Sequence, residues 1–266
     1  MQLYYKSYGE GHPLVILHGM LGDSGNWHTL ASTVFGKRFR VLTVDLRNHG
    51  RSPHSNEFSY EVMVADLLEL LDELDLSSVH LLGHSMGGKT AMHFALAHPE
   101  RVNDLVVVDI APVDYPELHD RAFEALLAID PAEFSSRDDI EVALSEYIEE
   151  IPVRLFLLKN VVHRDGKYSW KMNLEAIHTG YSTLREAVLG WQPFDGSTLF
   201  IRGGRSDYVL DEHEVSILTL FPNSEISTIE EVGHWVHAEA PERFGAMVID
   251  FLTELPGLDV GSRHGY

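Results

Sequence analysis

The sequence predicts an α/β fold in which a mostly parallel sheet is flanked by helices and interrupted by an all-helical insert. Strand-like apolar runs alternate with amphipathic, helix-like runs over residues 1–112, and strand-like runs return after about residue 193. Residues 113–193 show helical periodicity and no convincing strand. With 266 residues, of which 44% are hydrophobic, the chain can bury a core of this size.

The first half contains four short apolar runs, which we expect to be strands at residues 14–19, 39–46, 78–83 and 104–112. Helices are expected at residues 60–74 and 85–98, because apolar residues recur there at helical spacing and Pro99 ends the second run. Strands that are buried on both faces of a parallel sheet read as near-continuous apolar runs. The four strands are therefore predicted to lie in the centre of one parallel sheet.

The second half begins with helical runs, of which residues 117–130, 137–151 and 181–191 are the clearest. Strands are expected at residues 197–204 and 224–233, and a last helix at about residues 241–255. We therefore divide the chain into a core, residues 1–112 and 194–266, and a helical cap, residues 113–193. An insert of this kind is expected to lie over the carboxyl edge of the sheet, where open α/β folds bind ligands.

Composition excludes several classes of function. The formal net charge of −21 argues against nucleic acid or an anionic membrane as a partner. Without cysteine there is no disulfide and no thiolate, and the 16 histidines show no convincing metal-ligand spacing. No apolar run approaches the ~20 residues of a membrane span, and no signal peptide is recognisable. These observations predict a cytoplasmic protein without a metal, and they leave open whether it is a monomer or a homodimer.

The pentapeptide GHSMG, residues 83–87, places one serine between two glycines. This is the G-x-S-x-G pattern of a nucleophile elbow, in which Gly83 and Gly87 avoid collisions that a side chain would cause in the tight turn. The alternative is an ordinary N-cap serine, but the motif follows a predicted strand and opens a predicted helix. We therefore expect Ser85 to be a nucleophile, with the Met86 N–H as an oxyanion donor.

A serine hydroxyl needs a base, and His234 follows the last predicted strand, as the chain order Ser, acid, His requires. The Met20 N–H, in the loop after the first predicted strand, is the second candidate oxyanion donor. His18 is expected to brace that loop and His84 to pack beside the elbow. His237 is expected to have no particular role.

The acid has two candidates, Asp109 and Asp207, which each follow a predicted strand and lie between the serine and the histidine in the chain. Either could hold the imidazole in the required tautomer. Asp45 precedes the serine, and we expect it to brace its own loop with Arg47 or Arg51.

Six segments carry a family resemblance, in this order: LHGMLGDSGNW, VDLRNHGRS, GHSMGGKTAM, VVVDIAP, FIRGGRSDYV and VGHWVHAEAPERF. Together they resemble an α/β-hydrolase-fold serine esterase, over about residues 1–255. The nearest subgroup is typified by a bacterial esterase acting on acyl-thioesters and simple esters, with mitochondrial abhydrolase-domain relatives. Most α/β hydrolases place the acid after the strand that matches TLFIRGG, but Ser206 stands at that position and Asp207 is shifted by one. In the resembling subgroup the acid follows the strand after the elbow helix, so the resemblance favours Asp109.

The predicted function is hydrolysis of small to medium acyl esters, or thioesters, through an acyl-enzyme on Ser85 with His234 as general base. The substrate is a small-molecule ester, and no metal or organic cofactor is expected. Carbon–carbon hydrolysis, perhydrolysis and a lyase step like one in menaquinone synthesis would use the same residues. A lyase acting on a polyanion would be favoured by clustered cap arginines, from among Arg121, Arg137, Arg154, Arg164 and Arg185. A slowly turning-over ligand receptor is the alternative outside enzymes.

Overall fold

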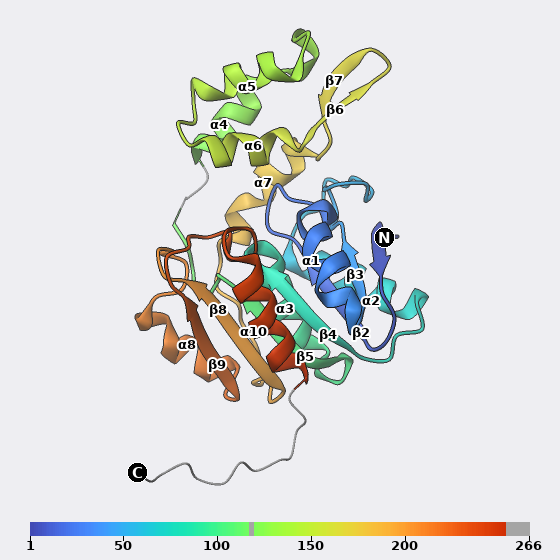
Figure 1. The fold of residues 1–266 in the computed structure, drawn as a ribbon, viewed down its shortest axis with the longest axis vertical. Coiled ribbons are helices and arrows are strands. Elements are labelled where there is room, and N and C mark those ends of the chain that lie inside the picture. Colours follow the sequence, from blue (N-terminus) through green and yellow to red (C-terminus); the bar gives the residue numbers. More distant parts are fainter. Residues whose placement is uncertain (117–119, 254–266) are drawn as a thin grey trace.

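The computed structural model describes residues 1–116 and 120–253, and in this part of the chain a seven-stranded sheet forms the centre (Figure 1). The strand order is β1-β3-β2-β4-β5-β8-β9, and β1 is antiparallel to β3 whereas the other pairs are parallel. The strands are β1 (Tyr5–Tyr8), β2 (Pro13–Leu17), β3 (Arg40–Val44), β4 (Val79–His84), β5 (Val102–Val108), β8 (Ser197–Gly203) and β9 (Ser224–Ile229).

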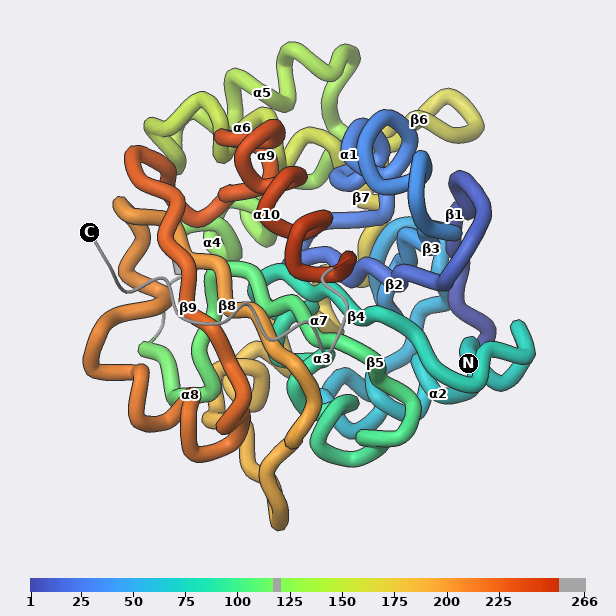
Figure 2. The backbone as a smooth tube through the Cα atoms, turned by 60° about the horizontal axis from the view of Figure 1, so that its bottom comes forward, coloured from blue at the N-terminus to red at the C-terminus, as the bar shows by residue number. Residues whose placement is uncertain are grey.

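Helices cover both faces of this sheet because its strands are apolar on both sides. In β2, Leu14 and Ile16 pack into one core cluster, whereas Val15 and Leu17 pack into the other, as the two-residue period of a strand requires. The first cluster includes side chains of α1 (His28–Thr33) and α10 (Pro241–Thr253). The second includes side chains of α2 (Tyr60–Glu73), α3 (Met86–Ala97) and α8 (Glu214–Leu220). Figure 2 shows α10 crossing over the sheet.

The predicted α/β fold with a mostly parallel central sheet is confirmed, and each predicted strand matches a strand of the sheet to within a few residues. Strand β1 and helices α1, α8 and α9 (Val236–Glu239) were not predicted. The β1 segment YKSY lies at the sheet edge, half-exposed, and has no apolar run to mark it. The last predicted helix is confirmed as far as Thr253, and its expected final residues, 254–255, lie outside the described residues.

The segment between β5 and β8 lies above the sheet in Figure 1. Its elements are α4 (Asp120–Ala128), α5 (Arg137–Ser145), α6 (Ile151–Leu158), β6 (Val161–Arg164), β7 (Lys167–Trp170) and α7 (Leu174–Leu184). The expectation of an all-helical insert is wrong, because β6 and β7 form an antiparallel hairpin. Asp165 and Gly166 join the two strands with positive φ of 50° and 79°, as a two-residue Asp-Gly hairpin turn requires.

Two predicted helices of this segment have different bounds in the structure. The single helix expected at residues 137–151 is two helices, because α5 ends at Ser145 and α6 begins at Ile151 with Pro152 in its first turn. The helix expected at residues 181–191 is wrong in position, since α7 ends at Leu184. Asn173 caps the start of α7, its side chain accepting a hydrogen bond from the Ala176 N–H. For the helix expected at residues 117–130, residues 117–119 lie outside the described part.

A buried lysine joins this upper segment to the core. Lys89 of α3 is 1% exposed, and its Nζ donates to the carbonyl oxygens of Val113 at 2.8 Å, Arg185 at 3.1 Å and Glu186 at 2.5 Å. Burial lowers the pKa of this amine to about 8. Lys89 therefore holds both connections between the upper segment and the core against the helix that begins at the elbow.

Within the described residues, no helix is both long enough and apolar enough to cross a membrane.

Candidate active site

The serine of the elbow stands on a strained turn between β4 and α3. Ser85 has a φ of 53° and a ψ of −119°, and its N–H donates to the Val108 carbonyl at 3.0 Å. A Cβ at Gly83 would lie 2.1 Å from the Gly87 carbonyl oxygen, and a Cβ at Gly87 would lie 2.5 Å from that of His18. These contacts are with backbone, which cannot rotate away. The turn therefore requires glycine at both positions.

Asp109 directly follows β5 and is completely buried. It also has a positive φ, 50°, and its N–H donates to the Ile201 carbonyl at 2.8 Å. Its Oδ1 accepts the Gly203 N–H at 2.9 Å, and its Oδ2 lies 2.7 Å from His234 Nδ1 and also accepts the Ser206 hydroxyl. The structure therefore brings Asp109 and His234 together from segments 125 residues apart.

The second candidate acid, Asp207, is exposed in the turn after β8. Among the described residues, the carboxylate hydrogen-bonded to the His234 ring is that of Asp109, and no such bond joins this ring to Asp207. Its neighbour Ser206 points inward instead and donates to Asp109. Ser206, where the resemblance places the acid of most α/β hydrolases, thus donates a hydrogen bond to Asp109.

Burial has the largest effect on the pKa of Asp109. Loss of solvent raises the pKa of its carboxyl from 3.8 to about 7, although the hydrogen bonds from Ser206 and Gly203 act in the opposite direction. A partner that carries a proton on Nδ1 compensates for this burial by donating to Oδ2. The geometry therefore favours the His234 tautomer that carries its proton on Nδ1, facing the carboxylate, with Nε2 on the side of the ring away from Asp109.

Three aromatic or histidine side chains hold the His234 loop in place. The Tyr208 ring stacks on the His234 ring, with 3.9 Å between centroids and a 20° interplanar angle. His84 Nε2 donates to the His234 carbonyl at 2.9 Å, and burial lowers the pKa of His84 well below its ordinary value. His237, expected to have no role, is buried, contacts the His84 ring and stacks on Trp27 with centroids 4.2 Å apart.

The loop that carries Met20 is braced by buried histidine. His18 Nδ1 donates to the Gly19 carbonyl at 2.8 Å, and its Nε2 accepts the Leu46 N–H at 3.0 Å, so the expected bracing role is confirmed. Met20 lies at the cavity beside Ser85, and Met86 is the first residue of α3. The first N–H groups of a helix have no partner within the helix. Both main chains are thus placed near the serine.

Asp45 braces the neighbouring loop, but with main-chain partners. Its Oδ1 accepts the Ser24 N–H at 2.6 Å and its Oδ2 accepts the Arg51 N–H at 2.8 Å. The Arg47 side chain pairs with Asp66 instead, at 2.6 Å. The predicted bracing role is confirmed for Arg51 through its backbone, whereas the expected use of Arg47 is wrong.

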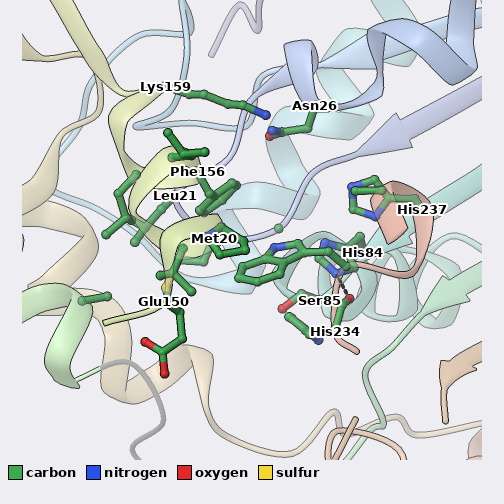
Figure 3. Close-up of a pocket in the computed structure, with 18 of the residues that line it drawn as sticks. Met20, Leu21, Asn26, His84, Ser85, Glu150, Phe156, Lys159, His234 and His237 are labelled. Atoms are coloured by element: carbon green, nitrogen blue, oxygen red, sulfur yellow. Dashed lines mark hydrogen bonds between the residues drawn. The ribbon is translucent and has the colours of Figure 1, made fainter. Parts of the chain in front are cut away.

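A cavity of about 810 Å³ opens above Ser85 (Figure 3). Its floor includes Ser85, His84 and His234, and its roof is made by residues of α6 and the segment before it, among them Glu150 and Phe156. Figure 3 shows the serine and the histidine side by side at one end, with Phe156 above them. Among the described residues, no group of three or more His, Asp or Glu side chains could hold a metal ion.

Comparison with known proteins identifies the family. A sequence model described as the alpha/beta hydrolase fold matches residues 12–140. The sn-1-specific diacylglycerol lipase ABHD11 of Mus musculus is 42% identical over 90% of this chain and 80% of its own length. The chain belongs to the α/β-hydrolase family. The resemblance to its esterases is confirmed by Esterase YbfF of Escherichia coli, 35% identical over 86% of this chain and 89% of the relative. A solved "Marine microorganism esterase" is 40% identical, with a TM-score of 0.92 over 94% of this chain and 99% of that one.

In this α/β hydrolase, sequence reasoning missed three residues around the histidine: Ser206, Tyr208 and His237. The signal for Ser206 was present, because the resemblance implies an acid at that position in most α/β hydrolases. Tyr208 and His237 gave no signal, since their contacts join residues that are 26 or more positions apart in the chain.

Proposed function

We propose that this α/β hydrolase is a serine carboxylesterase that hydrolyses small to medium acyl esters or thioesters. The proposal depends chiefly on one observation: a completely buried carboxylate, Asp109, lies 2.7 Å from Nδ1 of a histidine beside the elbow serine. That bond leaves Nε2 of His234 as the ring atom able to accept a proton from Ser85. The esterases among the relatives support the same chemistry.

The proposed reaction has two halves that share one set of residues. His234 removes the proton of Ser85, whose Oγ attacks the ester carbonyl, and the oxyanion is stabilised by the N–H groups of Met20 and Met86. His234 then gives its proton to the departing alcohol or thiol. Water repeats the sequence on the acyl-enzyme and releases the acid, while Asp109 stabilises the imidazolium that forms in each half.

Residues 113–193 are proposed to form a cap over a core made of residues 1–112 and 194–266. Support comes from the cavity above Ser85, whose roof consists of side chains from this segment, such as Val153 and Phe156. The apolar side chains of this roof exclude water from the part of the cavity that they cover and strengthen the electrostatic contacts beneath them. No metal or organic cofactor takes part in the proposed reaction, and a cytoplasmic location stays a prediction.

The arginines that would favour a lyase acting on a polyanion are mostly engaged elsewhere. Arg154 pairs with Glu141 at 2.6 Å, and Arg137 donates to the Leu158 carbonyl at 2.7 Å. Among the described residues, Arg121 lines the large cavity and Arg185 lines a smaller one that also includes Ser85, so the five arginines do not gather at one cavity. This arrangement favours the esterase over the lyase.

The test is steady-state hydrolysis of p-nitrophenyl acetate by the wild type and by Ser85→Ala. We expect multiple turnovers by the wild type, and a loss of at least about a thousandfold in kcat for the variant, because the nucleophile is removed. Thermal unfolding of both proteins serves as the control for folding. Absent turnover, or turnover that survives in Ser85→Ala, would reject the proposal in favour of the receptor or lyase alternatives.

A further inference from the structure

Ser85 lines two cavities of very different size. The large one, of about 810 Å³, has been described above. The other is a cavity of about 40 Å³, and the two have Met20, Ser85 and Tyr208 in common but otherwise different walls. An ester that reacts at Ser85 has two parts, the acyl group and the leaving group, so each part needs its own direction away from the serine.

The position of His234 decides which part goes where. In the tetrahedral intermediate the former carbonyl carbon carries Ser85 Oγ, the oxyanion, the leaving-group oxygen or sulfur, and the acyl chain. The leaving atom must lie within hydrogen-bond reach of the histidine that protonates it. His234 lines the large cavity and is not among the residues that line the small one. The leaving group therefore occupies the large cavity, and the acyl chain is left with the small one.

The walls of the small cavity are held by hydrogen bonds that leave little room for adjustment. The Tyr60 hydroxyl donates to the Leu184 carbonyl at 2.9 Å. The Tyr115 hydroxyl accepts the Ala111 N–H at 2.8 Å and donates to the Tyr208 carbonyl at 2.5 Å. Lys89, which also lines this cavity, already donates to three main-chain carbonyls.

The wall residues determine which groups the small cavity can bind and how large those groups can be. The hydroxyls of Tyr60 and Tyr115 and the Lys89 amine are bonded to main-chain groups. The other lining residues include Arg185 and apolar side chains such as those of Met86, Ile110 and Leu184. One water-sized group needs about 10–15 Å³ of such volume. A cavity of about 40 Å³ therefore accepts about three such groups beyond the carbonyl carbon.

We propose that the small cavity receives the acyl chain and limits the substrate to acyl groups of about two to four carbons, whereas the large cavity receives a much larger alcohol or thiol. This inference rests on the proposed esterase function. It narrows the substrate class to short-chain acyl esters of bulky leaving groups.

The test uses two ester series with the wild-type protein. In the first, the leaving group is p-nitrophenol and the acyl chain grows from acetyl through butyryl to octanoyl. In the second, the acyl group is acetyl and the alcohol grows from ethanol to octanol. We expect kcat/KM to fall by at least about a hundredfold between butyrate and octanoate, and to change by less than about tenfold along the alcohol series. Octanoate hydrolysed as efficiently as acetate, or a steep fall along the alcohol series, would overturn the inference.

A variant pair tests the cavity directly. Leu184→Ala enlarges the small cavity and leaves the main-chain carbonyl that accepts the Tyr60 hydroxyl. It should raise the hexanoate-to-acetate ratio of kcat/KM by about sixteenfold, at about fourfold for each of the two methylenes newly accommodated. The matched variant Leu155→Ala, in the large cavity, should leave that ratio within about twofold. An equal response of the ratio to both variants would contradict the assignment of the two cavities.

These results separate this inference from the proposed function. Ester hydrolysis that depends on Ser85, but with the two length preferences reversed, rejects the inference and leaves the esterase proposal intact. A protein that hydrolyses no ester in either series rejects both. The wild-type series needs no variant, so poor folding of Leu184→Ala would still leave a decisive measurement.

Discussion

Replacing Asp109 by asparagine changes a single atom and should nevertheless abolish most of the activity. Oδ1 of the asparagine can still accept the Gly203 N–H, but an NH₂ group now faces His234 Nδ1 where Oδ2 accepted its proton. The ring must then accept at Nδ1 and carry its proton on Nε2, where it cannot take one from Ser85. Flipping the amide does not help, because its NH₂ group would then meet the Gly203 N–H.

The size of the loss follows from the tautomer. A histidine held in the wrong tautomer by this substitution loses about 10⁴ in kcat, equivalent to about 5 kcal/mol of transition-state stabilisation. The fold should not be weakened at pH 8. Burial raises the pKa of Asp109 from 3.8 to about 7, so its stabilising contribution is complete below pH 3.8 and is lost as the pH rises through 7. The uncharged amide avoids the cost of burying a charge at pH 8.

The assay is kcat for p-nitrophenyl acetate at pH 8, together with thermal unfolding at the same pH. Asp207→Asn is the matched control, because it makes the same change at the second candidate acid. Asp207 is exposed and directly follows Ser206 in the chain. It should keep kcat within about twofold, and Asp109→Asn should unfold at a temperature no lower than the wild type. An Asp109→Asn variant within tenfold of the wild type, or a hundredfold loss in Asp207→Asn, would refute the reasoning.

Four further results are expected. The wild-type kcat/KM should rise with pH through about 7 as Asp109 loses its proton. Ser206→Ala removes a hydrogen bond that lowers this pKa, so the rising limb of a profile from about pH 5 to 9 should move to higher pH; an unmoved limb would argue against that contact. Gly83→Ala places a Cβ 2.1 Å from a backbone oxygen and should lower the free energy of unfolding in urea by about 3 kcal/mol, whereas an unchanged midpoint would show that the turn can relax. Lys89→Met removes three part-buried hydrogen bonds to main-chain carbonyls, at about 1 kcal/mol each, and should cost about 3 kcal/mol in the same measurement; full stability would mean that water replaces the amine.

Local signals in the sequence were enough to predict most strands of the central sheet. Each central strand is a continuous apolar run, because burial on both faces of a sheet demands one, and this made β2, β4 and β5 visible. The β6–β7 hairpin was missed because its residues are largely exposed, so burial left no pattern to read in them. Helix α7 was misplaced for a related reason: its N-cap, Asn173, marks the start only when the main-chain geometry around it is known.

The sequence by itself determined the elbow, because the need for glycine on each side of Ser85 is a steric property of a few neighbouring residues. It also determined that a histidine follows the last strand. Only the tertiary structure decided which carboxylate meets that histidine, because the 2.7 Å contact between Asp109 and His234 depends on the adjacent positions of β5, β8 and β9 in the sheet. The sequence also could not predict the two cavities that Ser85 lines. Their volumes depend on side chains that converge from distant segments and on how closely these side chains pack.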